Sequence, residues 1–91
     1  ALINNVSITK GQALGLVDGK IRMVSDSSND CIKRLADYMR NAAYITVFYG
    51  EGVPLKKAEK LQKMIERIAT EAEVMLVDGG QPLYDYIVSV E

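Results

Sequence analysis

Two glycine-rich segments carry the residue types best suited to binding. They are Tyr49-Gly50-Glu51-Gly52 and Asp78-Gly79-Gly80-Gln81-Pro82. Glycine lets backbone amides approach a partner closely, and an array of amides beside the start of a helix can hold an anion. Neither segment matches the G-x-G-x-x-G dinucleotide pattern or a Walker motif. Ordinary turn chemistry accounts for the same glycines, so the binding and the turn interpretations both stay open.

The sequence offers no constellation of catalytic residues. It contains no histidine and a single cysteine, Cys31. The absence of histidine excludes Ser-His and Cys-His catalysis and removes the commonest metal ligand. Cys31 has no base near it in sequence, and we expect it to be a small buried or half-buried residue. The aspartates stand singly at turns, so we expect no metal site.

Two other features could contact a protein partner. Tyr49 and Tyr84 flank the glycine-rich segments, and we expect both to be exposed, since exposed tyrosine is a preferred interface anchor. The second expected helix carries a basic stripe of Lys56, Lys60, Lys63 and Arg67. Such a stripe can receive an acidic partner, although a solvated helix face with modest intrahelical pairs has the same pattern.

Short apolar runs between turn signals predict the strands that must position these loops. The expected strands are Val6–Thr9, Gln12–Val17, Lys20–Val24, Tyr44–Tyr49, Val74–Val77 and Tyr86–Val90. The pair Asp18-Gly19 favours a type I′ turn and therefore a hairpin between the second and third strands. Across that hairpin we expect contacts between two leucines and two apolar partners, namely Leu14 and Leu16 with Ile21 and Met23.

Helical periodicity and capping residues predict two helices. Ser27, with Asp30 three residues later, can cap the first, and Pro54 fits the first turn of the second. The apolar face of the first helix is expected to comprise Ile32, Leu35, Ala36, Met39 and Ala43, and that of the second Ala58, Leu61, Ile65, Ile68 and Ala72.

The order of these elements predicts an α/β fold. We expect a small mixed sheet with two βαβ crossovers, an N-terminal β-hairpin and a C-terminal edge strand. The strand Tyr44–Tyr49 lacks alternation, which is typical of a central strand covered on both faces. Ligands gather at the carboxyl ends of parallel strands, so the two glycine-rich segments should share one rim of the domain.

Length and composition fit one small domain. The chain has 91 residues, 48% of them hydrophobic, and a formal net charge of −1. This charge balance argues against a nucleic-acid partner, and no apolar run is long enough for membrane insertion. A single cysteine suits a reducing compartment, so we expect a cytoplasmic location. We expect residues 1–5 to be a linker remnant and residues 6–91 to be one domain of a longer protein.

Three stretches together resemble a known family. They are Ile8-Thr9-Lys10-Gly11, Gly15-Leu16-Val17-Asp18-Gly19-Lys20-Ile21, and the ending from Gly79-Gly80-Gln81-Pro82-Leu83-Tyr84 through Ser89-Val90-Glu91. Over nearly its whole length the chain resembles the carboxyl-terminal domain of the bacterial fatty acid kinase subunit, once described as dihydroxyacetone-kinase-like. The Gly-Gly-Gln-Pro-x-Tyr ending is the specific part of the match.

The resemblance implies a role in lipid metabolism as part of a transferase. In that family an amino-terminal kinase domain phosphorylates the carboxylate of a fatty acid presented by a DegV-like carrier protein. The terminal domain would then help to engage the carrier, and its own fold would be similar to a DegV-like domain. ATP and magnesium would belong to the parent kinase domain, so no cofactor is expected in this chain. Cys31 inherits no role, and a homodimer formed through the parent protein is compatible with the resemblance.

Three functions stay open for the chain itself. The first is a non-catalytic domain that docks the DegV-like carrier through Tyr49, Gly50, Glu51, Gly52, Gly79, Gly80, Gln81, Pro82 and Tyr84. The second is a domain that binds an anion or a fatty acid itself. The third is a structural or dimerisation domain. We favour the first, because a chain of this length has few apolar residues to spare for a deep acyl cavity.

Overall fold

The computed structural model describes residues 2–3, 6–7 and 11–91, with side chains described from residue 11 onward. Its elements, in chain order, are β1 (Leu2–Ile3), β2 (Val6–Ser7), β3 (Gln12–Val17), β4 (Lys20–Ser25), α1 (Ser28–Arg40), β5 (Tyr44–Tyr49), α2 (Leu55–Ile68), β6 (Glu73–Asp78) and β7 (Tyr84–Val90). The chain is therefore a mixed α/β protein, as expected.

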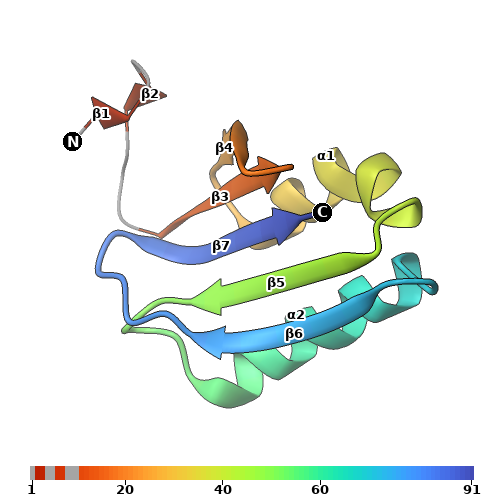
Figure 1. Cartoon of the computed structure of the whole chain (residues 1–91). Coiled ribbons are helices and arrows are strands. Elements are labelled where there is room, and N and C mark those ends of the chain that lie inside the picture. The colour runs from red at the N-terminus through yellow and green to blue at the C-terminus, as the bar shows by residue number, and fades with distance from the viewer. Residues whose placement is uncertain (1, 4–5, 8–10) are drawn as a thin grey trace.

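A five-stranded mixed sheet forms the body of the domain, in the order β4-β3-β7-β5-β6 (Figure 1). β3 runs parallel to β7, β5 runs parallel to β6, and the pairs β3–β4 and β5–β7 are antiparallel. β4, β5 and β6 consequently point the same way, which confirms the two predicted crossovers through α1 and α2.

The C-terminal strand is not at an edge of the sheet, and that part of the expectation is wrong. β7 lies between β3 and β5, and the edge strands are β4 and β6. The carbonyl of Glu91 accepts hydrogen bonds from the amides of Ala43 (2.8 Å) and Tyr44 (3.0 Å). A strand paired on both sides has its backbone N–H and C=O groups hydrogen-bonded to two neighbouring strands, which suits the apolar run in β7.

The predicted N-terminal hairpin is present. Asp18 and Gly19 have φ angles of 51° and 79°, as a type I′ turn requires. Leu16 pairs with Ile21, as predicted. The prediction that Met23 contacts the two leucines is wrong, because a bulge between Gly15 and Leu16 shifts the register. Met23 pairs with Gly15 and packs against the main core, on the face opposite Leu14 and Leu16.

The short strands β1 and β2 pair antiparallel in a separate two-stranded sheet. β2 is the described part of the expected strand Val6–Thr9, and Ile8 and Thr9 lie outside the described residues. β1 falls within the stretch expected to be a linker.

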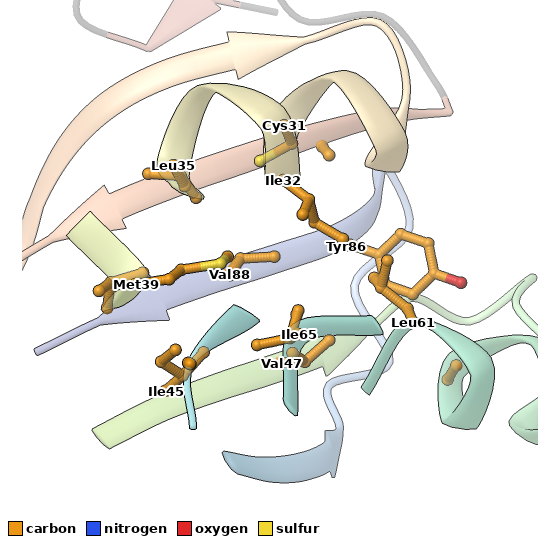
Figure 2. Close-up of a cluster of buried hydrophobic side chains, with 14 of the residues drawn as sticks. Cys31, Ile32, Leu35, Met39, Ile45, Val47, Leu61, Ile65, Tyr86 and Val88 are labelled. Carbon is orange, nitrogen blue, oxygen red and sulfur yellow. The ribbon is translucent and has the colours of Figure 1, made fainter. Parts of the chain in front are cut away.

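Both helices cover the same face of the sheet. Ser27 caps α1 by accepting a hydrogen bond from the Asp30 amide at 3.1 Å, as predicted. α1 packs on β3, β4 and β7, and α2 packs on β6 and against α1. The core between helices and sheet contains Leu35, Met39, Ile45, Val47, Ile65, Tyr86 and Val88 (Figure 2).

The other face of the sheet has no helical cover in residues 11–91, so the expectation that β5 is covered on both faces is wrong. β5 is nevertheless an interior strand. Ile45 and Val47 are fully buried, whereas Tyr44 is exposed and Thr46 is half-buried. On this open face, Leu14 and Tyr84 form a second apolar cluster with Leu16, Ile21, Val24 and Ile87.

Candidate functional site

The two glycine-rich segments meet at one rim of the domain, where β5 and β6 end and β7 begins (Figure 1). The amides of Gly79 and Gly80 donate to the carbonyl oxygen of Tyr49, at 3.0 and 3.3 Å. The amide of Glu51 donates to the carbonyl oxygen of Gln81 at 3.1 Å. The expected juxtaposition is thus present, and we call residues 49–52 and 78–84 the glycine rim.

Gly50 is the tightest point of the rim. Its amide donates to the carbonyl oxygen of Asp85 at 2.8 Å. A Cβ atom at this position would collide with the carbonyl oxygen of Tyr84 and lie 3.0 Å from that of Gln81. Glycine is therefore required here because two strands of backbone pass at contact distance.

The side chain of Gln81 also holds the rim together. Its Nε2 donates to the carbonyl oxygen of Phe48 at 3.0 Å, in a partly buried position. Together with the backbone hydrogen bonds, this contact fixes the loop before β7 against the end of β5. The rim is consequently preorganised, which lowers the entropy cost of binding.

The rim is poorly suited to an anion. The amides of Gly50, Glu51, Gly79 and Gly80 already donate within the domain. Glu51 is exposed, and the exposed Asp78 adds a second carboxylate. An anion would meet negative charge with few free donors, so these glycines do not form the amide cradle considered above.

The tyrosines differ from expectation, because Tyr84 is buried and Tyr49 is half-buried. Tyr84 is only 6% exposed and Tyr49 packs against the main core. A register shift between Gln12 and Ala13 turns Tyr84 onto the open face, beside Leu14. Burial raises the pKa of its phenol. The exposed tyrosines are Tyr38 and Tyr44, and neither belongs to the rim.

Three exposed apolar side chains, one in the rim and two on β6, were not anticipated. Leu83 is 40% exposed within the rim, and Met75 and Val77 are 46% and 37% exposed on β6. Sequence reasoning missed them because an apolar run in a strand looks the same whether one face or both are covered. The signal that could have found them is the lack of a third helix to cover the second face.

The basic stripe of α2 is exposed, as the sequence suggested. Lys56, Lys60, Lys63 and Arg67 all face solvent. The ion pairs found within residues 11–91 are Arg34–Asp30 and Arg40–Asp37, both in α1. The intrahelical pairs considered for α2 are therefore not formed.

Cys31 is a core residue, as expected. Its side chain is fully buried at the start of α1. Burial raises the pKa of the thiol to about 11, with a further increase from Asp30 and opposing effects of Arg34 and the Ser25 hydroxyl. The thiolate, which is the reactive form, is thus disfavoured at neutral pH.

Neither a metal cluster nor a spanning helix is found in the described part of the chain. No three His, Cys, Asp or Glu side chains there are grouped to hold a metal ion. Neither α1 nor α2 is long and apolar enough to cross a membrane.

A comparison of the sequence with known families found one matching family over the whole chain. Residues 1–91 match the family of C-terminal domains of FakA-like fatty acid kinase proteins. The chain belongs to this family. The comparison with solved structures found no match.

Individual relatives support the assignment. Protein YloV of Bacillus subtilis is 34% identical over 91 residues, which cover 98% of this chain and 16% of the relative. An uncharacterized protein of Staphylococcus haemolyticus is 33% identical, with the same coverage. An uncharacterized protein of Staphylococcus aureus is 29% identical and is covered to 17%. The chain thus spans about a sixth of the length of these relatives.

Proposed function

We propose that this chain is a non-catalytic docking domain of a fatty acid kinase-like protein. It engages a DegV-like fatty-acid-binding carrier, and the kinase part of the parent protein phosphorylates the fatty acid that the carrier presents. The observation that carries the proposal is the glycine rim of this family member, which is tied together by hydrogen bonds and still exposes Glu51, Gly52, Gly79, Gly80 and Pro82.

The charge of the rim indicates what kind of surface it would meet. Glu51 and Asp78 are exposed carboxylates, and residues 49–52 and 78–84 contain no lysine or arginine. Complementary potentials accelerate encounter and suppress wrong partners. The matching surface on the carrier is therefore basic.

The apolar centre of the interface is supplied by the exposed side chains next to the rim. Leu83, within the rim, is 40% exposed, and Val77, which precedes Asp78 in β6, is 37% exposed. Protein interfaces commonly place an apolar centre inside a polar border. Leu83 and Val77 would form that centre, with Glu51 and Asp78 in the border.

Catalysis is assigned to another part of the parent protein. ATP and magnesium would bind there, since this chain supplies neither a nucleotide-binding loop nor a histidine. The relatives are about six times as long as the chain, which leaves room for a kinase domain.

The alternative that this chain itself holds a fatty acid is less well supported. The pocket between α1 and α2 has a volume of about 190 Å³ and is lined partly by lysines. Cavities for drug-sized ligands usually span roughly 300–1,000 Å³ and are mainly apolar. This pocket is too small for an acyl chain.

The test compares two exposed glycines with the same backbone geometry. Gly80 in the rim and Gly19 in the hairpin have φ angles of 64° and 79°, and a Cβ atom at either meets nothing within 4 Å. Gly19 lies at the opposite end of the sheet, since the neighbouring Asp18 amide donates to Val90. Gly80→Arg should weaken binding to a DegV-like carrier at least tenfold in calorimetric titration, whereas Gly19→Arg should leave it unchanged.

A second pair tests the charge. Glu51→Lys should weaken carrier binding and reduce its salt dependence, because Asp78 then faces a lysine within the rim, while Glu66→Lys on α2 serves as the control. Equal loss of binding in rim and control variants, or no binding by the unaltered domain, would contradict the docking proposal. Binding of fatty acid without the carrier would favour the alternative.

A further inference from the structure

The open face of the sheet, which neither α1 nor α2 covers, carries an apolar row that crosses all five strands. The strand registers join one residue of each strand into this open-face row, in the order Val24, Leu14, Ile87, Phe48 and Val77. When one face of a sheet is solvated, its outward positions are commonly polar. An uninterrupted apolar row on the outward side therefore indicates that a further layer covers this face.

The cluster around Leu14 and Tyr84 supports the same conclusion. Both residues are only 6% exposed, although they lie on the face that lacks a helix. The Tyr84 hydroxyl is buried, and among the described residues it has no hydrogen-bond partner. Buried hydroxyls are normally paired. A layer packed over the cluster could complete it and offer the hydroxyl an acceptor.

The opposite side of this face is exposed. Met75 pairs with Thr46, two residues along from the pair of Phe48 and Val77, so its side chain lies on the same face. It is 46% exposed. Val77 ends the open-face row beside the glycine rim, where it stays available to the docking surface proposed above.

The acidic residues at this face give it a negative border. Glu73 lies two residues before Met75 in β6, so it shares the open face, and it is exposed. Asp26 follows β4 and accepts a hydrogen bond from the Gln12 side chain at 3.2 Å. Asp85 of β7 adds a half-buried carboxylate beside Tyr84.

The lysines and arginines of residues 11–91 do not balance these acids. Apart from two residues of β4, they all belong to α1 and α2, on the other side of the sheet. Lys20 pairs with Val17, which packs against the main core. Arg22 donates to the Tyr38 hydroxyl of α1 at 2.9 Å. A complementary cover is therefore apolar at its centre and basic at its border.

We infer that the part of the parent protein that precedes this domain packs over the open face, with apolar side chains on the open-face row and a lysine or arginine beside Glu73. The chain matches a family of C-terminal domains and spans about a sixth of its relatives, so most of such a protein lies before the domain. Permanent interfaces are more apolar than transient ones. The open-face row suits a cover that stays in place, whereas the polar rim suits a partner that leaves.

Other occupants fit this face less well. A second copy packed on it would bring a second set of carboxylates, and like charges brought together disfavour association. An anionic membrane surface would be repelled for the same reason. The inference does not depend on carrier docking, because the carrier is expected at the rim.

The first experiment treats the full-length parent protein with dilute hydrogen peroxide and follows each methionine by peptide mass spectrometry. Met75 on the open face and Met64 on α2 are a native matched pair, since they are 46% and 38% exposed in the domain itself. A free face predicts that Met75 is oxidised at least as fast as Met64. We expect Met75 to react at least about tenfold more slowly, because a cover blocks access to its sulfur.

Two references make the rates comparable. The same methionines in the urea-unfolded parent protein give their unprotected rates. Met39, which is fully buried, reports in every sample that the domain is folded. In the separate 91-residue chain, Met75 and Met64 should react at similar rates, since the cover is then missing. The comparison within the parent protein needs no substitution and decides the matter by itself.

A charge reversal tests the basic border. Glu73→Lys in the parent protein should raise the oxidation rate of Met75 at least about threefold, because the new lysine repels a basic cover. Glu66→Lys is the matched control, since Glu66 is exposed on α2, and it should leave that rate unchanged. Continued full protection of Met75 in Glu73→Lys would overturn the assignment of a basic border.

Four results would overturn the inference. The first is equal protection of Met75 and Met64 in the parent protein. The second is protection of Met75 in the 91-residue chain that rises with protein concentration, which would identify a second copy as the occupant. The third is protection that arises only when a DegV-like carrier is added, and the fourth is protection only by anionic vesicles. Carrier affinity is measured separately, so failure of this inference and failure of the docking proposal are distinguishable.

Discussion

The carbonyl oxygen of Tyr49 accepts a hydrogen bond from the amide of Gly79 at 3.0 Å. These residues stand at the ends of neighbouring parallel strands, β5 and β6. The contact closes the gap between the two glycine-rich segments and makes them one surface. The conformation of each segment therefore depends on the other, and substitutions in either should affect both.

Gly50→Ala should destabilise the domain by about 2 kcal/mol or more. The added methyl group meets the carbonyl oxygens of Tyr84 and Gln81, which belong to hydrogen-bonded backbone and cannot move away easily. Gly52→Ala is the control, since a Cβ atom there meets nothing within 4 Å. Urea unfolding measures both. Equal stability of the two variants would show that the backbone at Gly50 can relax.

Gln81→Glu should cost more stability than Gln81→Ala at neutral pH. Alanine loses the hydrogen bond from Nε2 to the carbonyl oxygen of Phe48, a loss of about 1 kcal/mol. Glutamate instead places a carboxylate against that carbonyl oxygen. Protonation of the new carboxyl should restore part of the loss on acidification. Thermal unfolding at neutral and mildly acidic pH checks this order, and a Glu variant as stable as wild type would contradict it.

Tyr84→Phe should leave stability unchanged or raise it by up to about 1 kcal/mol. The Tyr84 hydroxyl is buried and has no hydrogen-bond partner in the described part of the chain. Removing it relieves a desolvation cost while keeping the ring beside Leu14. Tyr84→Ala should cost about 3 to 5 kcal/mol, because it empties the cluster on the open face. Chemical denaturation distinguishes the two, and a marked loss in the Phe variant would reveal a partner for the hydroxyl.

The domain should lose stability in alkali through Cys31. Burial raises the pKa of this thiol from 9.0 to about 11. Below pH 9 the thiol is protonated in both the folded and the unfolded chain, so its full contribution to the free energy of unfolding is present. Between about pH 9 and 11 the unfolded chain releases the proton first, and stability should fall by about 2 to 3 kcal/mol.

Cys31→Ala provides the control for this pH dependence. It should cost about 1 kcal/mol or more at neutral pH through lost packing, but its stability should fall less steeply above pH 9. The raised pKa values of Tyr84 and Tyr86 leave a residual decline at still higher pH. An unchanged alkaline slope in the Ala variant would show that the thiol is not responsible.

Sequence alone determined the features that depend on neighbouring residues. The Asp18-Gly19 turn follows from the positive φ angles that these residue types tolerate. The start of α1 follows from the Ser27 hydroxyl and the amide three residues later. Most of the buried face of each helix follows from a period of 3.6 residues, and Cys31 fits the same pattern. The predicted members Ala43 and Ala72 are wrong, because α1 ends at Arg40 and α2 at Ile68, and Ala43 is exposed. Each of these signals acts within a few residues, so the chain displays it before any tertiary contact forms.

Only the tertiary structure decided the strand order and the faces of individual side chains. The placement of β7 between β3 and β5 depends on pairing between distant segments, which no local preference encodes. Register shifts beside Gly15 and Gln12 turn Met23 and Tyr84 to faces that simple alternation does not predict. A one-residue shift reverses the direction of every later side chain, since strands have a period of two. The pocket at Tyr86 likewise exists only because packing of α1 against α2 brings Ser28 and Lys57 to the same side of β7.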